Sequence, residues 1–531
     1  MSRKESRIAP RILIALLASM VTMSISAVEP TKRPTLVVGI MVDGLREDYL
    51  ELLKGYFGND GFNRLMTQGV MLENVDYGPG SDYASATAMI YTGTSASVNG
   101  IASATAYDAE KKMSYPIVLD PSKIGNYTDE TYSPAALLVS TLSDEIRIDA
   151  GGTGYVYSIA PDATQSILMS GHAGNSAFWI NDVTGKWATT TYYKDVPATI
   201  QTRNYRQPLS HRLDTLVWTP SMSLDRYPDL PEYKRHYAFS HRFLEKDKNR
   251  YRAYKQSAPV NAEVTSIASD YIKTLSLGQR DVMDMLNIGY TLVPYTYGKE
   301  TDNRLELMDS YIKLDRQLAQ LFSAIDRTAG LNNTLIFLAG TPVPVSGKRD
   351  EEQWGIPTGE FSSRRAISLL NVYLMAKHGN GEWVSGFHDN QFYLNHKLIK
   401  EHALDVKDLR ADAADFVARM SGVSSVVTID DVCSGDADNS HALRRNINLN
   451  TAGDLLVNVN PGWEIVDEVK GETKRTVSRT AATSAPVFIL APGIAPQRIG
   501  REIDASIIAP TVARLLRIRS PNASSNKPLR L

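Results

Sequence analysis

The chain has 531 residues, which suits one large α/β domain with insertions or two to three domains of average size. Hydrophobic residues make up 43% and charged residues 22%, so a disordered or fibrous protein is excluded. The 57 Lys and Arg residues nearly balance the 59 Asp and Glu residues, and no block of like charge favours a nucleic-acid partner. Because Cys433 is the only cysteine, disulfides within the chain and cysteine-based metal sites are excluded.

The first 26 residues have the pattern of a secretory signal peptide. A basic start, with arginine at positions 3, 7 and 11 and lysine at position 4, precedes an apolar run over residues 12–25. This run is shorter than the roughly 20 residues that a membrane-spanning helix needs, and Ser24 and Ser26 suit a cleavage site. We therefore predict a signal peptide over residues 1–26, no later transmembrane segment, and a periplasmic or secreted protein. An uncleaved signal anchor is the alternative.

Four short apolar runs predict buried strands. The first, residues 35–42, is continuous in β-branched and aliphatic side chains and ends at Asp43. Similar runs cover residues 155–160, 334–339 and 486–490. Residues 305–325 carry apolar side chains at helical spacing. Strands that alternate with helices predict an α/β protein with a mainly parallel sheet sandwiched by helices, in which ligands bind at the carboxyl ends of the strands.

Two segments interrupt this alternation. Residues 186–259 are rich in Tyr, Arg, Pro and Trp and show little periodicity, so we expect a cap insertion over the sheet. Its basic end, residues 232–255, is either a solvated surface or a cap that faces phosphate. Residues 362–460 form a second insertion. A helix pattern over residues 411–420 and a strand pattern over residues 423–428 predict a small α+β subdomain there.

Three segments together resemble the alkaline phosphatase superfamily: residues 38–50 (VGIMVDGLREDYL), 90–101 (IYTGTSASVNGI) and 508–516 (IAPTVARLL). Their order and spacing are most similar to those of the exported, phosphate-irrepressible alkaline phosphatases and of nucleotide pyrophosphatase/phosphodiesterases. The resemblance covers residues 34–529 and implies the α/β fold of that superfamily over this span.

The resemblance also implies a chemistry. Members of the superfamily hydrolyse phosphate esters through a covalent phosphothreonine, with two zinc ions held by three aspartates and three histidines. One zinc ion activates the nucleophile and the other stabilises the leaving oxygen. An asparagine and a Lys-x-Arg pair hold the phosphoryl oxygens, where negative charge collects in the transition state.

Matched position by position, most of the zinc ligands are replaced in this chain. Asp43 is the one ligand position that keeps its residue. The other positions correspond to Thr291, Tyr295, Thr341, Pro342 and Arg475, of which the last is the weakest match. The nine histidines leave the interval between His241 and His378 empty, although two ligand motifs should lie there. Zinc requires about four N, O or S ligands, so we expect no zinc cofactor.

The position of the nucleophile is also changed. The threonine of the family corresponds to Tyr83. A shift of two residues would place Ser81 or Ser85 there instead, so a hydroxyl nucleophile remains an alternative. Asp82 could join Asp43 in a weak calcium or magnesium site, although such ions need about six or more oxygen ligands. Without zinc or a histidine base, neither serine has an evident route to deprotonation.

The groups that hold phosphate are lost together with the metals. The asparagine corresponds to Ala104, and the Lys-x-Arg pair corresponds to Asp162 and Thr164. An aspartate at this place would repel phosphate. We expect Asp43, Tyr83, Thr291, Thr341 and Arg475 to meet at the carboxyl edge of the sheet in a degenerate pocket. Tyr83, Tyr290, Tyr295 and Tyr297 either fill the space left by the metals or line a pocket for a sugar, peptide or lipid.

Two functions follow from these residues. The first is a catalytically inactive pseudoenzyme that uses the phosphatase fold as a scaffold and binds an unknown protein or small-molecule partner in the cell envelope. The second is an active phosphatase or phosphodiesterase with a rebuilt site. The loss of ligands, nucleophile and phosphate-binding side chains as a group favours the first, because a fold alone does not carry a function.

Overall fold

The computed structural model describes residues 33–299, 302–343, 354–435, 440–469, 472–477 and 483–531. The predicted signal peptide lies outside these residues. Residues 34–531 form one compact unit, which is the unit described below. In the described part of the chain, no helix combines the length and apolar character that a membrane span requires.

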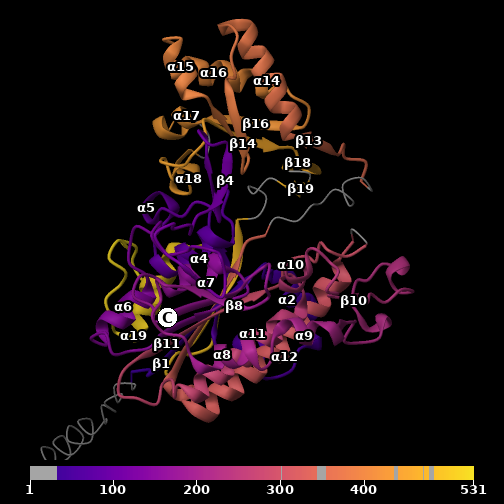
Figure 1. The fold of residues 1–531 in the computed structure, drawn as a ribbon. Coiled ribbons are helices and arrows are strands. Elements are labelled where there is room, and N and C mark those ends of the chain that lie inside the picture. Colours follow the sequence, from indigo (N-terminus) through magenta and orange to yellow (C-terminus); the bar gives the residue numbers. More distant parts are fainter. Residues whose placement is uncertain (1–32, 300–301, 344–353, 436–439, 470–471, 478–482) are drawn as a thin grey trace, which may run out of the picture. The chain divides into compact units, whose positions relative to one another are not determined.

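A large central sheet organises the described unit (Figure 1). Its strands run in the order β21-β2-β20-β12-β1-β11-β6-β7-β8-β5, and β22 pairs with β2. The bounds are β1 (Leu36–Asp43), β2 (Val70–Asp76), β5 (Gly125–Asn126), β6 (Val156–Ile159), β7 (Ser176–Ile180), β8 (Trp187–Thr190), β11 (Asp284–Thr291), β12 (Thr334–Thr341), β20 (Ser484–Leu490), β21 (Gln497–Ile499) and β22 (Ile503–Asp504). The centre of the sheet, from β12 through β7, is parallel.

The four predicted strands are all present, and the predicted fold class is confirmed. One detail differs: β20 pairs antiparallel with both β12 and β2, so the run over residues 486–490 is an antiparallel strand in a mainly parallel sheet. A strand that is buried on both faces is apolar throughout, whether its neighbours are parallel or antiparallel to it. The sequence pattern therefore could not reveal the direction of β20. The helix predicted over residues 305–325 is α12 (Arg304–Thr328).

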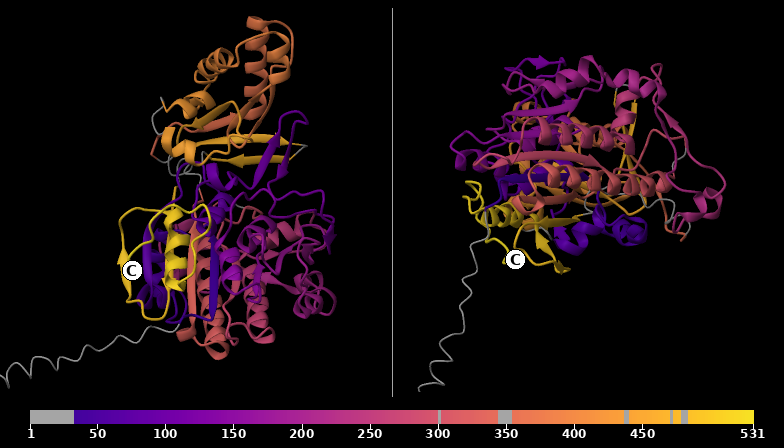
Figure 2. Two further views of the ribbon diagram at one scale, coloured as in Figure 1. Left: turned by 90° about the vertical axis from the view of Figure 1, so that its left-hand side faces the viewer. Right: turned by 90° about the horizontal axis from the view of Figure 1, so that it is seen from below.

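Helices cover both faces of the sheet (Figure 2). The alternation of side chains along β1 divides its residues between two hydrophobic clusters. Val38, Ile40 and Val42 pack on one side, and Val37 and Met41 pack on the other. The first cluster includes residues of α2 (Glu47–Leu53), α3 (Phe62–Gln68), α11 (Ala258–Thr274) and α12, and the second includes residues of α4 (Tyr83–Thr92), α6 (Leu142–Asp149), α7 (Ala163–Ser170) and α19 (Ile508–Leu516).

The packing is closest at Gly39, in the middle of β1. A Cβ atom there would clash with the hydroxyl of Tyr91 and would lie 2.7 Å from the ring of Phe337. The Tyr91 hydroxyl in turn donates a hydrogen bond of 2.9 Å to Asn287 Oδ1 on the adjacent strand β11. Position 39 therefore requires glycine because neighbouring side chains approach its backbone closely, and not because of an unusual backbone conformation.

Residues 359–476 contain two small sheets, with strand orders β14-β15-β17-β16 and β13-β18-β19. Most elements of this segment contribute to a hydrophobic cluster that is separate from the clusters of the main sheet. Leu370, Trp383 and Leu455 are fully buried members of this cluster. The elements are β13 (Gly359–Ser362), α14 (Ser363–His378), β14 (Val384–His388), β15 (Gln391–Leu394), α15 (His396–Glu401), α16 (Val406–Val417), β16 (Val423–Thr428), α17 (Ile429–Ser434), α18 (Ser440–Arg445), β17 (Leu455–Val459), β18 (Trp463–Val469) and β19 (Glu472–Thr476). The helix and strand patterns of this segment match α16 and β16, while its bounds at 362–460 stay a prediction.

The cap insertion predicted over residues 186–259 begins later than expected. Its first strand, β8, pairs with β7 and β5 and belongs to the central sheet. The remainder contains α8 (Ala198–Tyr205), α9 (Leu209–Thr215), β9 (Val217–Trp218), β10 (His241–Arg242) and α10 (Arg250–Lys255). Sequence reasoning missed β8 because it is short and follows directly after a turn.

Asp309 of α12 forms hydrogen bonds that hold this segment against the helices of the central sheet. Its side chain is fully buried. Its Oδ2 atom accepts a hydrogen bond from Trp218 Nε1 at 2.7 Å, and its Oδ1 atom accepts from Ser221 N at 2.6 Å and from the Tyr227 hydroxyl at 2.8 Å. The carboxylate therefore satisfies three donors, two of which belong to fully buried side chains.

We predict that Asp309→Ala lowers the free energy of unfolding by about 3 kcal/mol, because it leaves buried donors without an acceptor. Urea denaturation would measure the loss, and limited proteolysis should show faster cleavage within residues 191–257. Asp326→Ala, at an exposed position on the same helix, serves as the control. Equal stability of the two variants would contradict the anchoring role.

Candidate functional site

The last residues of three neighbouring strands meet at the carboxyl edge of the central sheet. Asp43 ends β1, Thr291 ends β11 and Thr341 ends β12. In the parallel registers, Asp43 is opposite Thr291 on one side and Thr341 on the other. The predicted convergence of these three residues is confirmed, although they span about 300 positions of sequence (341 − 43 = 298).

Asp43 forms a direct hydrogen bond with the residue that replaces a family ligand. The Thr341 hydroxyl donates to Asp43 Oδ1 at 2.7 Å, and Gly44 N donates to Thr341 Oγ1 at 3.3 Å. The pKa of Asp43 is raised to about 7, chiefly by burial; the hydrogen bond from Thr341 lowers it, and the nearby charges of Asp162 and Asp82 raise it. The Asp43 carboxyl group is thus partly protonated near neutral pH.

Tyr83 lies close to these carboxylates, at the first residue of α4. Burial raises its pKa well above the usual value of 10, and the charges of Asp162, Asp82 and Asp43 raise it further, whereas a hydrogen bond with Thr164 lowers it. The phenol therefore stays protonated at physiological pH. A neutral phenol among three carboxylates has no activated oxygen for attack on phosphorus.

The two alternative nucleophiles are both engaged in hydrogen bonds. Ser81 is buried, and its hydroxyl donates to the Tyr77 carbonyl at 2.8 Å and accepts from Asn446 Nδ2 at 3.2 Å. Ser85 accepts from Asp82 N at 2.9 Å, as the second half of the capping box that begins α4. Both serines thus contribute to the local structure of this turn, and their hydrogen bonds involve no histidine.

At the positions that would hold phosphate, the chain presents a methyl group and a carboxylate. Ala104 N donates to Asp82 Oδ2 at 2.7 Å, and its side chain offers no hydrogen bond. Asp162 is the N-cap of α7, where Oδ1 accepts from Gln165 N at 3.1 Å. The N-terminus of a helix favours an anion, and here the protein supplies that anion itself. Thr164 is buried in the first turn of the same helix.

The described residues directly after β11, 292–299, include no His, Cys, Asp or Glu, and they are packed with aromatic rings. The side chain of Asn261 holds the backbone of Thr291, accepting from Thr291 N at 3.0 Å and donating to Thr291 O at 2.8 Å. The ring centroid of Tyr295 lies 4.6 Å from that of His241 and 5.3 Å from that of Trp218. Both partners come from the insertion predicted over residues 186–259, and sequence reasoning did not identify them.

Tyr290 also serves packing, because it is fully buried and its hydroxyl lies 2.8 Å from Thr265 Oγ1. Tyr297 lies at the surface with 38% of its side chain exposed. Of the two roles considered for the tyrosines, filling of the core therefore describes Tyr290 and Tyr295. Pro342, which follows Thr341, is buried and has no side-chain atom that could bind a metal.

Arg475 does not belong to the central sheet, so its predicted place at this edge stays a prediction. Arg475 belongs to β19, in the small sheet formed with β13 and β18. Its guanidinium group lies 2.5 Å from Glu360 Oε1 and 3.3 Å from Glu464 Oε2, and about half of the side chain is exposed. Two acidic partners on neighbouring strands thus fix Arg475 in a surface ion pair.

Two zinc ions do not fit the residues at this edge. The positions in contact with Asp43 present hydroxyl groups, and the neighbouring carboxylates of Asp82 and Asp162 each cap a helix. Throughout the described ranges, no group of three or more His, Cys, Asp or Glu side chains is arranged to hold a metal ion. Zinc needs about four such ligands, and one aspartate with threonines and a proline does not provide them.

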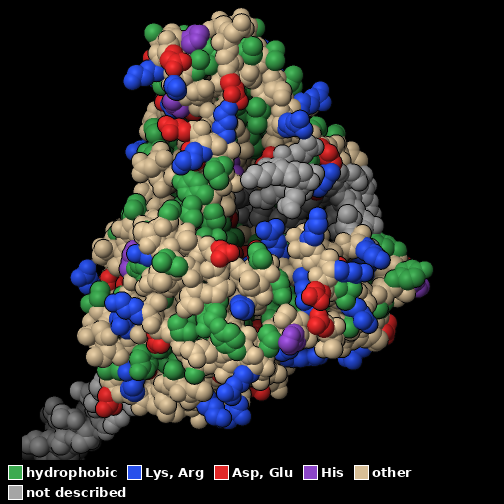
Figure 3. All heavy atoms as spheres, viewed as in Figure 1, with side chains coloured by type: hydrophobic (Ala, Val, Ile, Leu, Met, Phe, Trp, Pro, Cys, Tyr) green, Lys and Arg blue, Asp and Glu red, His purple; other side chains and the backbone are tan. Residues whose placement is uncertain are grey.

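Some of the cations of residues 232–255 have partners within the protein. Arg250 pairs with Asp214, and Lys255 pairs with Asp182. The Lys234 ammonium group donates to the backbone carbonyl of Asp302. Lys and Arg are interspersed with Asp and Glu over the face seen in Figure 3. Arg250 and Lys234 are buried, so they belong to the interior, and the choice between a solvated surface and a phosphate-facing cap for the rest of the segment stays a prediction.

Comparison with known proteins identifies the family. Residues 37–482 match the family described as type I phosphodiesterase / nucleotide pyrophosphatase. The chain belongs to this family. It is 26% identical to alkaline phosphatase PafA of Elizabethkingia meningoseptica over 94% of each chain, and 27% identical to alkaline phosphatase PhoV of Synechococcus elongatus over 93% of this chain and 92% of the relative.

The fold agrees with this assignment. The crystal structure of wild-type alkaline phosphatase PafA superposes with a TM-score of 0.81 at 25% identity and covers 94% of this chain and 98% of its own. Murine ectonucleotide pyrophosphatase/phosphodiesterase 5 shares the fold with a TM-score of 0.50 at 14% identity. The chain thus keeps the architecture of this alkaline phosphatase over nearly its whole length.

The raised pKa of Asp43 predicts a pH-dependent stability. The folded protein keeps the Asp43 proton up to about pH 7, whereas the unfolded chain releases it near 3.8, so stability falls as the pH rises from 4 through 7. Asp43→Asn, which cannot ionise and still accepts from Thr341, should be more stable relative to the natural protein at pH 8.5 than at pH 5. Chemical denaturation at both pH values measures this difference.

Asp129→Asn, at an exposed position, is the matched control and should show the same difference at both pH values. A constant difference for Asp43→Asn would mean that Asp43 is already ionised in the folded protein at pH 5.

Proposed function

We propose that this chain is a catalytically inactive member of the family, exported to the periplasm or beyond, that serves as a binding or scaffold protein in the cell envelope. The observation that carries the proposal is the contact between Asp43 and Thr341. In the family, Asp43 would be a zinc ligand; here its carboxylate accepts a hydrogen bond from a threonine that stands at another ligand position.

The electrostatics of the edge support the same conclusion. A phosphoryl group carries negative charge that increases on its equatorial oxygens in the transition state. Asp43, Asp82 and Asp162 place three carboxyl groups around Tyr83, close enough for each to raise its pKa. An anionic substrate would therefore meet repulsion at the place where the family's phosphatases bind it.

The alternative, a hydrolase with a rebuilt site, also has one observation in its favour. A carboxyl group with a pKa of about 7, such as that of Asp43, is suited to general acid–base catalysis. A water molecule activated by Asp43 would then replace the nucleophile.

We predict that purified mature protein, dialysed against zinc and then against metal-free buffer, retains well under one zinc ion per chain, since the edge lacks ligands. Elemental analysis by inductively coupled plasma mass spectrometry measures this content. Hydrolysis of p-nitrophenyl phosphate and of bis(p-nitrophenyl) phosphate should stay at background. Alkaline phosphatase PafA, prepared in the same way, provides the positive control.

The variants Asp43→Ala, Ser81→Ala and Ser85→Ala distinguish the two functions. If the protein is inactive, none of them changes the background rate. Stoichiometric zinc, or a robust turnover that Asp43→Ala abolishes, would overturn the proposal. Turnover that depends on Ser81 or Ser85 would establish a rebuilt nucleophile.

A further inference from the structure

The imidazole ring of His172 lies between two hydrogen-bond acceptors, in the turn that joins α7 to β7. Its Nδ1 atom lies 3.3 Å from Asp144 Oδ2 on α6, and its Nε2 atom lies 2.9 Å from the backbone carbonyl oxygen of Leu137. A neutral imidazole carries one N–H group and one lone pair, so it can donate only one of these two hydrogen bonds. Both contacts are hydrogen bonds only when the ring carries a proton on each nitrogen.

The Asp144 carboxylate is an acceptor in this contact. Its Oδ2 atom also accepts from Thr141 N at 2.8 Å and from the Thr141 hydroxyl at 2.9 Å. Its Oδ1 atom accepts from Ala173 N at 2.7 Å. Because three donors already converge on this carboxylate, it accepts from the His172 ring and does not donate to it.

The surroundings of the ring favour its charged form. The hydrogen bond with Asp144 raises the pKa of His172 above 6.5; burial lowers this pKa, and the charge of Asp144 and the contact with the Leu137 carbonyl raise it. The charge that acts on the ring is therefore that of Asp144.

The other ionisable side chains near the ring contact the backbone or one another. The Tyr192 hydroxyl donates to the backbone carbonyl of His172 at 2.9 Å, and the Lys123 ammonium lies 5.9 Å from the centroid of the Tyr192 ring. On α6, Glu145 lies 3.8 Å from the Arg519 guanidinium. Titration of the ring is thus linked first to the contact with the α6 carboxylate.

Residues 134–139 form a strap that is held at both ends. Just before it, Ser133 N donates to the Val118 carbonyl at 2.9 Å. Just after it, Ser140 N donates to Asn522 Oδ1 at 3.0 Å. The strap is neither helix nor strand, so the contacts of its middle decide how firmly it is held.

His172 holds the middle of this strap through the Leu137 carbonyl. The next residue, Leu138, donates its backbone N–H to the Asn99 carbonyl at 3.0 Å. The Leu137 side chain is buried in a hydrophobic cluster, whereas Leu138 is 64% exposed. Loss of the contact with His172 would therefore loosen the part of the strap that covers the cluster.

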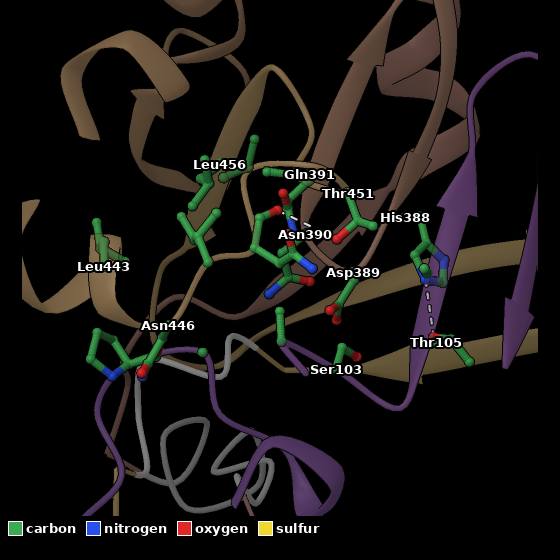
Figure 4. Close-up of a pocket in the computed structure, with 18 of the residues that line it drawn as sticks. Ser103, Thr105, His388, Asp389, Asn390, Gln391, Leu443, Asn446, Thr451 and Leu456 are labelled. Carbon is green, nitrogen blue, oxygen red and sulfur yellow. Dashed lines mark hydrogen bonds between the residues drawn. The ribbon is translucent and has the colours of Figure 1, made fainter. Parts of the chain in front are cut away.

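The cluster under the strap is shared with two other features. Leu137 belongs to it together with Ala106 and Ile117, which line a small pocket of about 90 Å³ (Figure 4). Ala84 of α4 is a further member, and α4 begins at Tyr83. Movement of the strap would change packing that the pocket wall and this helix share.

We propose that His172 is a pH-dependent latch, which holds residues 134–139 closed over this cluster when the ring is protonated and releases them when it is neutral. The neutral ring keeps its remaining proton on Nδ1, because the charged carboxylate of Asp144 is a stronger acceptor than a carbonyl. Nε2 then presents a lone pair to the Leu137 carbonyl, and this contact is lost. The latch lies outside the carboxyl edge of the central sheet, so the proposal does not depend on whether the chain is catalytic.

The direction of the pH dependence follows from the raised pKa. The folded protein binds the His172 proton more tightly than the unfolded chain does. The stabilisation is therefore fully present below pH 6.5 and is lost as the pH rises through the higher pKa of the folded protein.

Hydrogen exchange of the mature protein, followed by mass spectrometry, measures how firmly the strap is held. Protection of peptides that cover residues 135–139, corrected for the intrinsic exchange rate at each pH, should fall about fivefold between pH 5.5 and pH 8.5. Protection of a peptide from β11 should stay constant. NMR titration of the His172 ring should give a midpoint above 6.5.

Two variants assign the effect to this ring. His172→Gln cannot titrate, so the pH dependence of the strap should disappear. His236→Gln, at an exposed histidine that lies 3.4 Å from Glu232, is the matched control and should keep the pH dependence. Strap protection that does not change with pH in the natural protein, an unchanged pH dependence in His172→Gln, or a midpoint for His172 at or below 6.5 would each overturn the proposal. The first and third measurements use the natural protein, so they decide the matter independently of how well a variant folds.

Discussion

The whole site depends on the parallel pairing of β1 between β11 and β12. Eight residues of β1 pair on each side without a shift of register, and most are buried on both faces of the sheet. The register fixes which residues lie side by side. The ends of the three strands therefore meet whatever path the segments that connect them take. Asp43, Thr291 and Thr341 are neighbours for this reason. The fold would bring those positions together whatever side chains they carried, so the architecture does not depend on the chemistry at the edge.

Much of this arrangement could be predicted from the sequence. Continuous apolar runs give buried strands, and the helical spacing over residues 305–325 gives α12, because burial imposes these local patterns. The resemblance to a family then placed Asp43, Thr291 and Thr341 at one edge, and the structure has them in register. It also placed Asp162 near the site, where the carboxylate caps a helix and raises the pKa of its neighbours.

The features that were missed all depend on partners distant in sequence. Arg475 is held by Glu360 across a small sheet, and no local pattern reports that pairing. The aromatic contacts of Tyr295 come from Trp218 and His241, which lie in a segment without periodicity.

The packing around Tyr295 limits which side chains this position accepts. Tyr295 is buried, and its ring contacts those of Trp218 and His241. Replacing it with a smaller imidazole would open a cavity, and zinc needs about four ligands. A single substitution towards metal binding here would therefore lower the stability of the fold before a complete set of ligands was assembled.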